Sequence, residues 1–285
     1  MGADNSRPTQ PHQSAQRTFQ RIPDQYETYE QLQQALRASG LESSNLILAI
    51  DYTKSNTWTG QQSFQGRCLH DIDPTGQSWN PYQSVIHIMG KTLEAFDDDK
   101  LIPAYGFGDS TTGSRACFPF LPNGQVCTGF GQVLERYNQI TPQMSLAGPT
   151  NFAPVIREAI SIVQEHRSYH ILVIIADGQV SNEKDTIDAI VAASQFPICN
   201  PGLQLTKIDP CSCLAIIMVG VGDGPWDMMQ KFDDQIPSRR FDNFQFVEFN
   251  KMLRHNSRNP EVGFATAALM EIPDQFKTLR RMGML

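Results

Sequence analysis

Three side chains that carry oxygen stand at alternate positions directly after an apolar run near residue 50. The run "NLILAI" is followed by "DYTKSN", which contains Asp51, Thr53 and Ser55. In an extended segment, side chains two positions apart face the same way, so one carboxylate and two hydroxyls can form a single row. Such a row can bind a hard cation, but it can also cap a helix or form a turn.

Further oxygen-bearing side chains stand close to later apolar runs. Thr150 stands in "AGPT" before a helical pattern, Asp177 follows "YHILVIIA", and Asp223 follows "CLAIIMVGVG". No Cys or His stands among these positions, which disfavours zinc and favours Mg²⁺, with Mn²⁺ or Ca²⁺ as alternatives. From spacing alone, a second interpretation stays open, in which Asp51 and Ser55 cap a turn and Asp177 begins an Asp-Gly turn.

The elements that must position these side chains alternate between strand and helix. Several of the apolar runs are unbroken stretches of Ile, Val and Leu, which is typical of parallel strands buried on both faces. We expect strands at 45–51, 101–109, 169–177, 213–223 and, at the sheet edge, 244–249. We expect helices at 29–39, 80–96, 131–140, 150–166, 183–196, 226–234 and 261–272. This order predicts an α/β fold, a doubly wound, mostly parallel, Rossmann-like sheet with helices on both faces. In such a sheet, ligands bind beyond the carboxyl ends of the strands.

Composition excludes several classes of protein. The chain has 285 residues, of which 40% are apolar and 19% charged, and its formal net charge is −7. An acidic balance argues against a nucleic-acid-binding protein. No stretch approaches the roughly 18 consecutive apolar residues of a membrane span, and the polar N-terminus predicts no secretory signal. The six cysteines are then reduced thiols, and we expect a cytoplasmic protein, with the nucleus as an alternative.

The first 27 residues differ from the rest in composition. They are rich in Gln, Pro, Ser and Arg, and such a segment cannot bury enough apolar surface to order itself, so we expect a flexible tail at 1–27. The start "MGADNS" fits the motif M-G-x-x-x-[ST], which predicts N-myristoylation of Gly2. One acyl chain binds membranes with an association constant on the order of 10⁴ M⁻¹. The expected membrane contact is therefore weak, reversible and peripheral, at the plasma membrane.

Longer stretches of the sequence resemble a known family. They are "LIPAYGFGD", "AGPTNFAPVI", "VIIADGQV", "VGVGDGPWDMM" and "FDNFQFVEF". These stretches look like the copine subclass of von Willebrand factor A domains, and in particular like the copine domain of plant-type RING ubiquitin ligases. The resemblance covers roughly residues 28–277 and leaves 278–285 as a C-terminal tail.

The resemblance implies a function for the oxygen-bearing residues. By position, D-x-[ST]-x-S, the loop threonine and the strand-end aspartate of the metal-ion-dependent adhesion site correspond to Asp51, Thr53, Ser55, Thr150 and Asp177. Relatives with this site bind Mg²⁺ and a protein partner that offers an acidic side chain to the ion. The resemblance thus implies a metal-dependent protein-binding module, and we expect no catalytic residues in this chain.

Two departures from the plant-type relatives leave an alternative open. A RING binds two zinc ions through paired Cys and His ligands, but after Cys213 the chain has no cysteine and only one histidine, His255. We therefore expect no RING-dependent ubiquitin transfer by this chain. The alternative function is the substrate-recruiting part of a RING-type ubiquitin ligase pathway, with the RING lost or supplied by another chain. The second departure is the segment 197–212, which we interpret as a surface insertion or a gene-model artefact in preference to a metal site at Cys211 and Cys213. A metal-dependent hydrolase is disfavoured because no general base pairs with a nucleophile.

Overall fold

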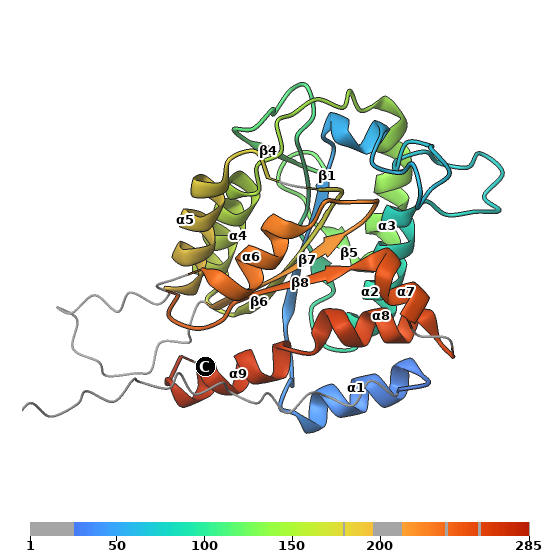
Figure 1. The fold of residues 1–285 in the computed structure, drawn as a ribbon. Coiled ribbons are helices and arrows are strands. Elements are labelled where there is room, and N and C mark those ends of the chain that lie inside the picture. The colour runs from blue at the N-terminus through green and yellow to red at the C-terminus, as the bar shows by residue number, and fades with distance from the viewer. Residues whose placement is uncertain (1–25, 179, 196–212, 237–238, 256–257, 285) are drawn as a thin grey trace, which may run out of the picture.

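A computed structural model describes residues 26–178, 180–195, 213–236, 239–255 and 258–284 (Figure 1). In this part of the chain, six strands form one sheet in the order β4-β3-β1-β6-β7-β8. The strands of this sheet are β1 (Asn45–Asp51), β3 (Ala104–Phe107), β4 (Cys117–Pro119), β6 (Tyr169–Ala176), β7 (Cys213–Gly220) and β8 (Phe244–Glu248). All neighbours pair in parallel except β3 and β4. The predicted mostly parallel sheet is therefore confirmed.

Helices cover both faces of the sheet, as predicted (Figure 1). One face is covered by α4 (Ala153–His166), α5 (Glu183–Ser194) and α6 (Asp227–Gln235). The other face is covered by α1 (Tyr29–Ala38), α2 (Pro81–Leu93), α3 (Gly129–Ile140), α7 (Phe249–His255), α8 (Pro260–Leu269) and α9 (Ile272–Arg281). The short 3-10 turns η1 (Lys54–Thr57) and η2 (Thr141–Gln143) complete the helical elements of the described residues.

The central strand β1 shows why the apolar runs carry no polar alternation. Leu46, Leu48 and Ile50 lie in the core beneath α2 and α8, whereas Ile47 and Ala49 lie in the core beneath α4 and α5. Successive side chains of a strand point to opposite faces, so a strand with a helical layer on each side needs apolar residues at every position. At about 25 cal/mol per Å² of apolar surface removed from water, these two cores dominate the stabilisation of the fold.

Several boundaries differ from those expected from the sequence. The strand expected at 101–109 is divided at Pro103, which has no N–H group to donate, into β2 (Leu101–Ile102) and β3. Strand β2 leaves the main sheet and pairs antiparallel with β5 (Cys127–Thr128). The helix expected at 261–272 is α8 (Pro260–Leu269), and a separate helix, α9 (Ile272–Arg281), follows it. Residues 278–281, which we expected in the C-terminal tail, therefore belong to a helix. Of the tail expected at 1–27, residues 1–25 lie outside the described residues, and so does the segment 197–212.

The order in which successive strands are added to the sheet changes side at β1. Chain order runs outward from β1 to β3 on one side and from β6 through β7 to β8 on the other. Ligands of doubly wound sheets bind at the carboxyl ends of the strands that flank such a reversal. Here these are the ends of β1 and β6, where Asp51 and Asp177 stand.

Candidate metal site

The five predicted ligands lie together at the carboxyl ends of β1 and β6. The hydroxyl oxygens Thr53 Oγ1 and Ser55 Oγ are 2.9 Å apart, and Ser55 Oγ donates a hydrogen bond of 2.9 Å to Asp177 Oδ1. Thr150 Oγ1 lies 3.3 Å from Thr53 Oγ1. Asp51, the last residue of β1, accepts a hydrogen bond of 2.8 Å from Thr53 N through its Oδ1 atom.

Local backbone structure explains how these side chains meet. Beyond β1 the chain continues extended to Thr53, which forms a parallel bridge with Ala147, and then turns into η1, which carries Ser55. The bridge aligns the loop before α4 with the end of β1, and three residues later this loop contains Thr150. Asp177 is the first residue after β6. Thr150 lies in a loop, as expected, but its side chain is buried.

Two carboxylates face each other in this site with little solvent. Asp51 and Asp177 are both fully buried. Burial, followed by repulsion from Asp177, raises the pKa of Asp51 well above its usual range. Burial also raises the pKa of Asp177, although hydrogen bonds from Thr59 and Ser55 oppose the rise. None of the ion pairs found among the described residues includes either aspartate. The site therefore has no cationic side chain of its own, and a bound cation would favour the ionised form of both carboxyl groups.

One carboxylate oxygen without a hydrogen-bond partner indicates that these residues suit a metal ion. Asp51 Oδ2 is buried and has no hydrogen-bond partner among the described residues, and an unpaired buried carboxylate oxygen is costly. A hard divalent ion bound by carboxylates and hydroxyls would satisfy it. The described residues contain no group of three or more His, Cys, Asp or Glu arranged for a metal, because this site combines two carboxylates with three hydroxyls. The donor set thus fits Mg²⁺, Mn²⁺ or Ca²⁺.

Two residues that sequence reasoning missed contact the site. Thr59 Oγ1 donates a hydrogen bond of 2.6 Å to Asp177 Oδ2, so both oxygens of this carboxylate are held by hydroxyls. Gly108, which follows β3, lies against Thr53 with a φ of +83°. Thr59 stands four residues after Ser55, a spacing of one helical turn that could have marked it. The contact of Gly108 has no local sequence signal.

Asp223, which also follows a strand, has a different role. Its two carboxylate oxygens accept hydrogen bonds from the backbone N–H groups of Gln62 and Ser63, at 2.8 and 2.9 Å. Asp223 therefore holds the loop that follows η1 and does not join the five converging side chains.

Three buried polar side chains hold the backbone at the end of β1 through hydrogen bonds. His70, Tyr82 and Asn56 all contact the carbonyl oxygen of Asp51. Burial lowers the pKa of His70 to about 3, so the imidazole is neutral at physiological pH. Only the fold reveals the position of His70 at the end of β1, where it contacts Asp51.

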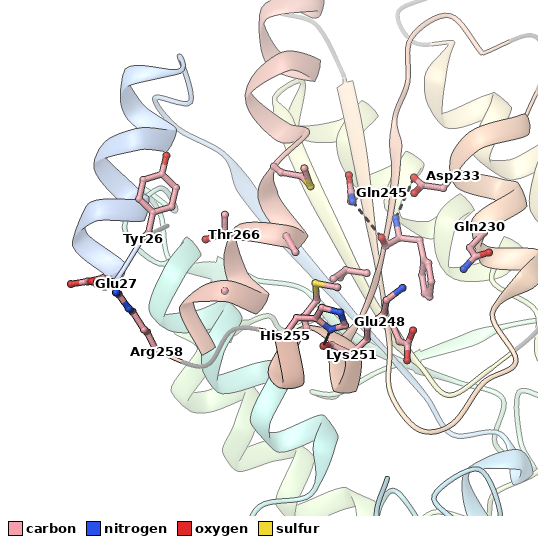
Figure 2. Close-up of a pocket in the computed structure, with 16 residues that line it drawn as sticks. Tyr26, Glu27, Gln230, Asp233, Gln245, Glu248, Lys251, His255, Arg258 and Thr266 are labelled. Carbon is pink, nitrogen blue, oxygen red and sulfur yellow. Dashed lines mark hydrogen bonds and ion pairs between the residues drawn. The ribbon is translucent and has the colours of Figure 1, made fainter. Parts of the chain in front are cut away.

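A cavity of about 910 Å³ lies elsewhere, beside the edge strand β8 (Figure 2). It is lined by residues of α6, β8, α7 and α8, and by Tyr26 and Glu27. Its charged groups are mixed, and at one side Arg258 forms an ion pair of 2.8 Å with Glu27. Asp233 accepts a hydrogen bond of 3.3 Å from the N–H of Phe246 on β8. None of the five predicted ligands lines this cavity.

Comparisons with known proteins agree with the resemblance seen in the sequence. Residues 68–200 and 208–285 match the copine family. The chain is 48% identical over 284 residues to the E3 ubiquitin-protein ligase RGLG1 of Arabidopsis thaliana, with 94% of this chain and 54% of that protein covered. It is 50% identical over 263 residues to Copine family protein 2 of Caenorhabditis elegans, with 91% of this chain and 3% of that protein covered. The chain thus spans about half the length of the ligase.

The solved structures that the comparison found include the manganese-loaded TRAP protein of Plasmodium vivax. The two proteins are 11% identical, and the match covers 74% of this chain and 70% of the TRAP chain, with a TM-score of 0.43.

Within the part of the chain that the structure describes, no helix is long and apolar enough to cross a membrane.

Proposed function

This chain belongs to the copine family, and from that premise we propose that it is a protein-binding module that depends on a divalent cation, Mg²⁺ in the first place. The residues that hold the ion are Asp51, Thr53, Ser55, Thr150 and Asp177. A protein partner contributes an Asp or Glu side chain to the same ion. Mn²⁺ and Ca²⁺ are the alternative ions.

The observation that carries this proposal is the unpaired Oδ2 atom of Asp51 beside the second buried carboxylate of Asp177. Two buried like charges destabilise a fold unless an opposite charge joins them. The neutral hydroxyls around them add oxygen ligands without adding charge. Two carboxylates only just neutralise a divalent ion, so a further acidic group from a partner is tolerated. When bound, the ion supplies the positive charge that recognises this group.

Each residue has a defined part in the proposed site. Asp51 and Asp177 provide the charge, and the hydroxyls of Ser55 and Thr59 orient the carboxylate of Asp177. Thr150 comes from a different loop and closes the row of oxygens opposite Thr53.

Calorimetric titration of Mg²⁺ and of Mn²⁺ tests the proposal. We expect the wild type to bind, Asp177→Ala to lose binding, and Thr150→Ala to bind about fivefold more weakly, about 1 kcal/mol for one lost polar contact to a charged group. Thr141→Ala is the matched control, because Thr141 is as buried as Thr150 but bonds to Tyr52. Equal affinity in the wild type and Asp177→Ala would show that these oxygens are only turn residues.

A second function is favoured by the identity of 48% to an E3 ubiquitin-protein ligase. In this proposal the domain recruits substrates for ubiquitination, and the RING is supplied by another chain. Affinity purification in Mg²⁺ and in chelator, followed by mass spectrometry, tests it. Enrichment of RING proteins together with ubiquitin-conjugated proteins in Mg²⁺ is the expected result. Metal-dependent partners without any ubiquitin machinery would favour the first function alone.

A lipid anchor is proposed for the N-terminus. Gly2 lies outside the described residues, and the motif "MGADNS" alone supports its myristoylation. We propose that the protein is cytoplasmic or nuclear, with a fraction bound reversibly at the plasma membrane. Co-expression with an N-myristoyltransferase is expected to add the mass of a C14 acyl chain in the wild type and not in Gly2→Ala. An unmodified wild-type N-terminus would contradict this proposal.

A further inference from the structure

The carbonyl oxygen of Asp51 is surrounded by hydrogen-bond donors. His70 Nε2 lies 2.7 Å from it, and Tyr82 OH and Asn56 Nδ2 each lie 3.2 Å from it. All of these side chains are buried. The shortest and most direct contact is that of His70, since the other two donors are shared with further acceptors.

The tautomer of His70 follows from its two partners. A carbonyl oxygen can only accept, so Nε2 must carry the proton and Nδ1 must be an acceptor. The donor to Nδ1 is the hydroxyl of Tyr137, at 2.8 Å. That hydroxyl in turn accepts a hydrogen bond of 3.1 Å from Asn80 Nδ2. Three hydrogen bonds therefore connect Asn80, the N-cap of α2, to the backbone of Asp51.

Aromatic stacking fixes the plane of the imidazole ring. The ring of His70 is stacked on Tyr82 at a centroid distance of 4.1 Å and on Tyr52 at 4.7 Å, with interplanar angles of 18° and 17°. The ring is therefore held between two parallel rings. It can reorient only if this stack opens, so its Nε2–H group keeps one direction.

The peptide unit between Asp51 and Tyr52 is held at both ends. Its N–H group, on Tyr52, donates a hydrogen bond of 2.7 Å to the carbonyl oxygen of Phe107. Its carbonyl oxygen, on Asp51, accepts the hydrogen bond from His70. Because this peptide unit is attached to the Cα atom of Asp51, its orientation decides where the carboxylate of Asp51 points.

We propose that His70 is a positioning residue for the metal site. By donating to the carbonyl oxygen of Asp51, it holds the end of β1 in the conformation that presents the Asp51 carboxylate to the ion. Tyr137 belongs to the same device, because its hydroxyl enforces the tautomer of His70 that donates. This inference rests on the proposed metal-binding function and adds residues that never touch the ion.

Two tyrosine variants separate positioning from general stability. Tyr137→Phe removes the donor to His70 Nδ1, whereas Tyr52→Phe removes a buried hydroxyl that bonds to Thr141 at 2.8 Å. Both rings are fully buried, and both variants keep the ring. We expect both to lower the unfolding midpoint, but only Tyr137→Phe to weaken Mg²⁺ binding in calorimetry. The expected loss is about tenfold, the lower end for residues that orient metal ligands.

Variants of His70 itself give a second comparison. His70→Gln can place an amide N–H group near the Nε2 position, so we expect it to keep more Mg²⁺ affinity than His70→Leu, which has no donor. Nitrogen NMR of the metal-free wild type is a readout that needs no ion, and the Nε2–H tautomer is expected. An Nδ1–H tautomer would overturn the inference.

The outcomes distinguish this inference from the function on which it rests. If the wild type binds Mg²⁺ and Tyr137→Phe binds as Tyr52→Phe does, the positioning role is wrong and the metal site stands. If the wild type binds no divalent ion, the proposed function is wrong, and the role of His70 falls with it. A selective loss in Tyr137→Phe, with partial retention in His70→Gln, supports both.

Discussion

Gly108 lies so close to Thr53 that a Cβ atom on residue 108 would sit 2.4 Å from Thr53 Cγ2. The two residues belong to different strand ends, and Gly108 also has a φ of +83°, where a side chain costs roughly 1–2 kcal/mol. We expect Gly108→Ala to displace Thr53 and to weaken Mg²⁺ binding at least tenfold in calorimetry. Gly113→Ala is the control, because Gly113 has a φ of +53° with nothing within 4 Å. It should lose stability without losing affinity, and equal affinity in both variants would contradict the role of the contact.

Thr59 is expected to contribute to metal binding without being a predicted ligand. Its hydroxyl donates to Asp177 Oδ2, so Thr59→Val keeps the shape of the side chain and removes one hydrogen bond to a charged group. Such a bond is worth about 1.5–3 kcal/mol. Because the bound ion still holds the carboxylate of Asp177 in part, we expect a smaller effect, about fivefold weaker Mg²⁺ binding. Thr57→Val, which loses only a hydroxyl contact to the backbone of Lys54, should bind as the wild type does. A loss of equal size in both variants would trace the effect to the turn.

Asp51→Asn is expected to stabilise the metal-free protein. The substitution replaces a buried carboxyl group, whose pKa burial and the neighbouring Asp177 raise, with a neutral amide that cannot ionise. We expect a gain of about 1 kcal/mol, seen as a rise of roughly 2–4 °C in the unfolding midpoint in chelator. In excess Mg²⁺ the order should reverse, because ion binding stabilises only the wild type, by about 2.7 kcal/mol at 100 times Kd. A variant that is less stable than the wild type in chelator would argue against charge repulsion in the site.

Stability should fall as the pH rises through neutrality because of carboxyl groups beside β8. Burial, followed by repulsion from Asp233 and Asp242, raises the pKa of Glu271 to about 8, and burial raises that of Asp233 to about 7. A raised pKa means that the folded state holds protons that the unfolded state has released, so stability is present at low pH and is lost as pH rises towards these values.

Urea denaturation at pH 6.0 and 8.5 measures this effect. For Glu271 the expected loss of unfolding free energy over this interval is on the order of 2 kcal/mol. Glu271→Gln should remove most of that part of the pH dependence, while the contribution of Asp233 remains. An unchanged difference between the two pH values in Glu271→Gln would show that Glu271 is ionised in the folded protein throughout.

The convergence of the predicted ligands could be anticipated from the sequence because it depends on local rules. Asp51, Thr53 and Ser55 alternate at a strand end, and Asp177 ends a strand of the same parallel sheet, so the fold class alone brings them to one edge. The hydrogen bond from Thr59 to Asp177 spans 118 residues and has no local pattern. That these residues bind a metal stays a prediction.

Helix α9 and strand β4, which the sequence analysis did not predict, differ in whether their own sequence indicates them. In α9, Ile272, Phe276 and Leu279 recur at helical spacing and are buried, so the signal was present and was overlooked. Strand β4 has only three residues and an exposed or partly exposed pattern, and it forms because β3 offers a free edge. Such a strand depends on its neighbour, and no window of its own sequence indicates it.

The place of β1 in the sheet has a consequence for synthesis on the ribosome. Strand β1 pairs with β6 such that Asn45 lies opposite His170, so the centre of the sheet is translated about 125 residues before one of its two neighbours. At roughly 5–20 residues per second, the apolar strand Asn45–Asp51 waits about 6–25 s for that partner. During this time it can pair with strands of other nascent chains, so early chaperone binding would act on this segment. Asp51 and Asp177 can come together only after β6 has been synthesised and has paired with β1.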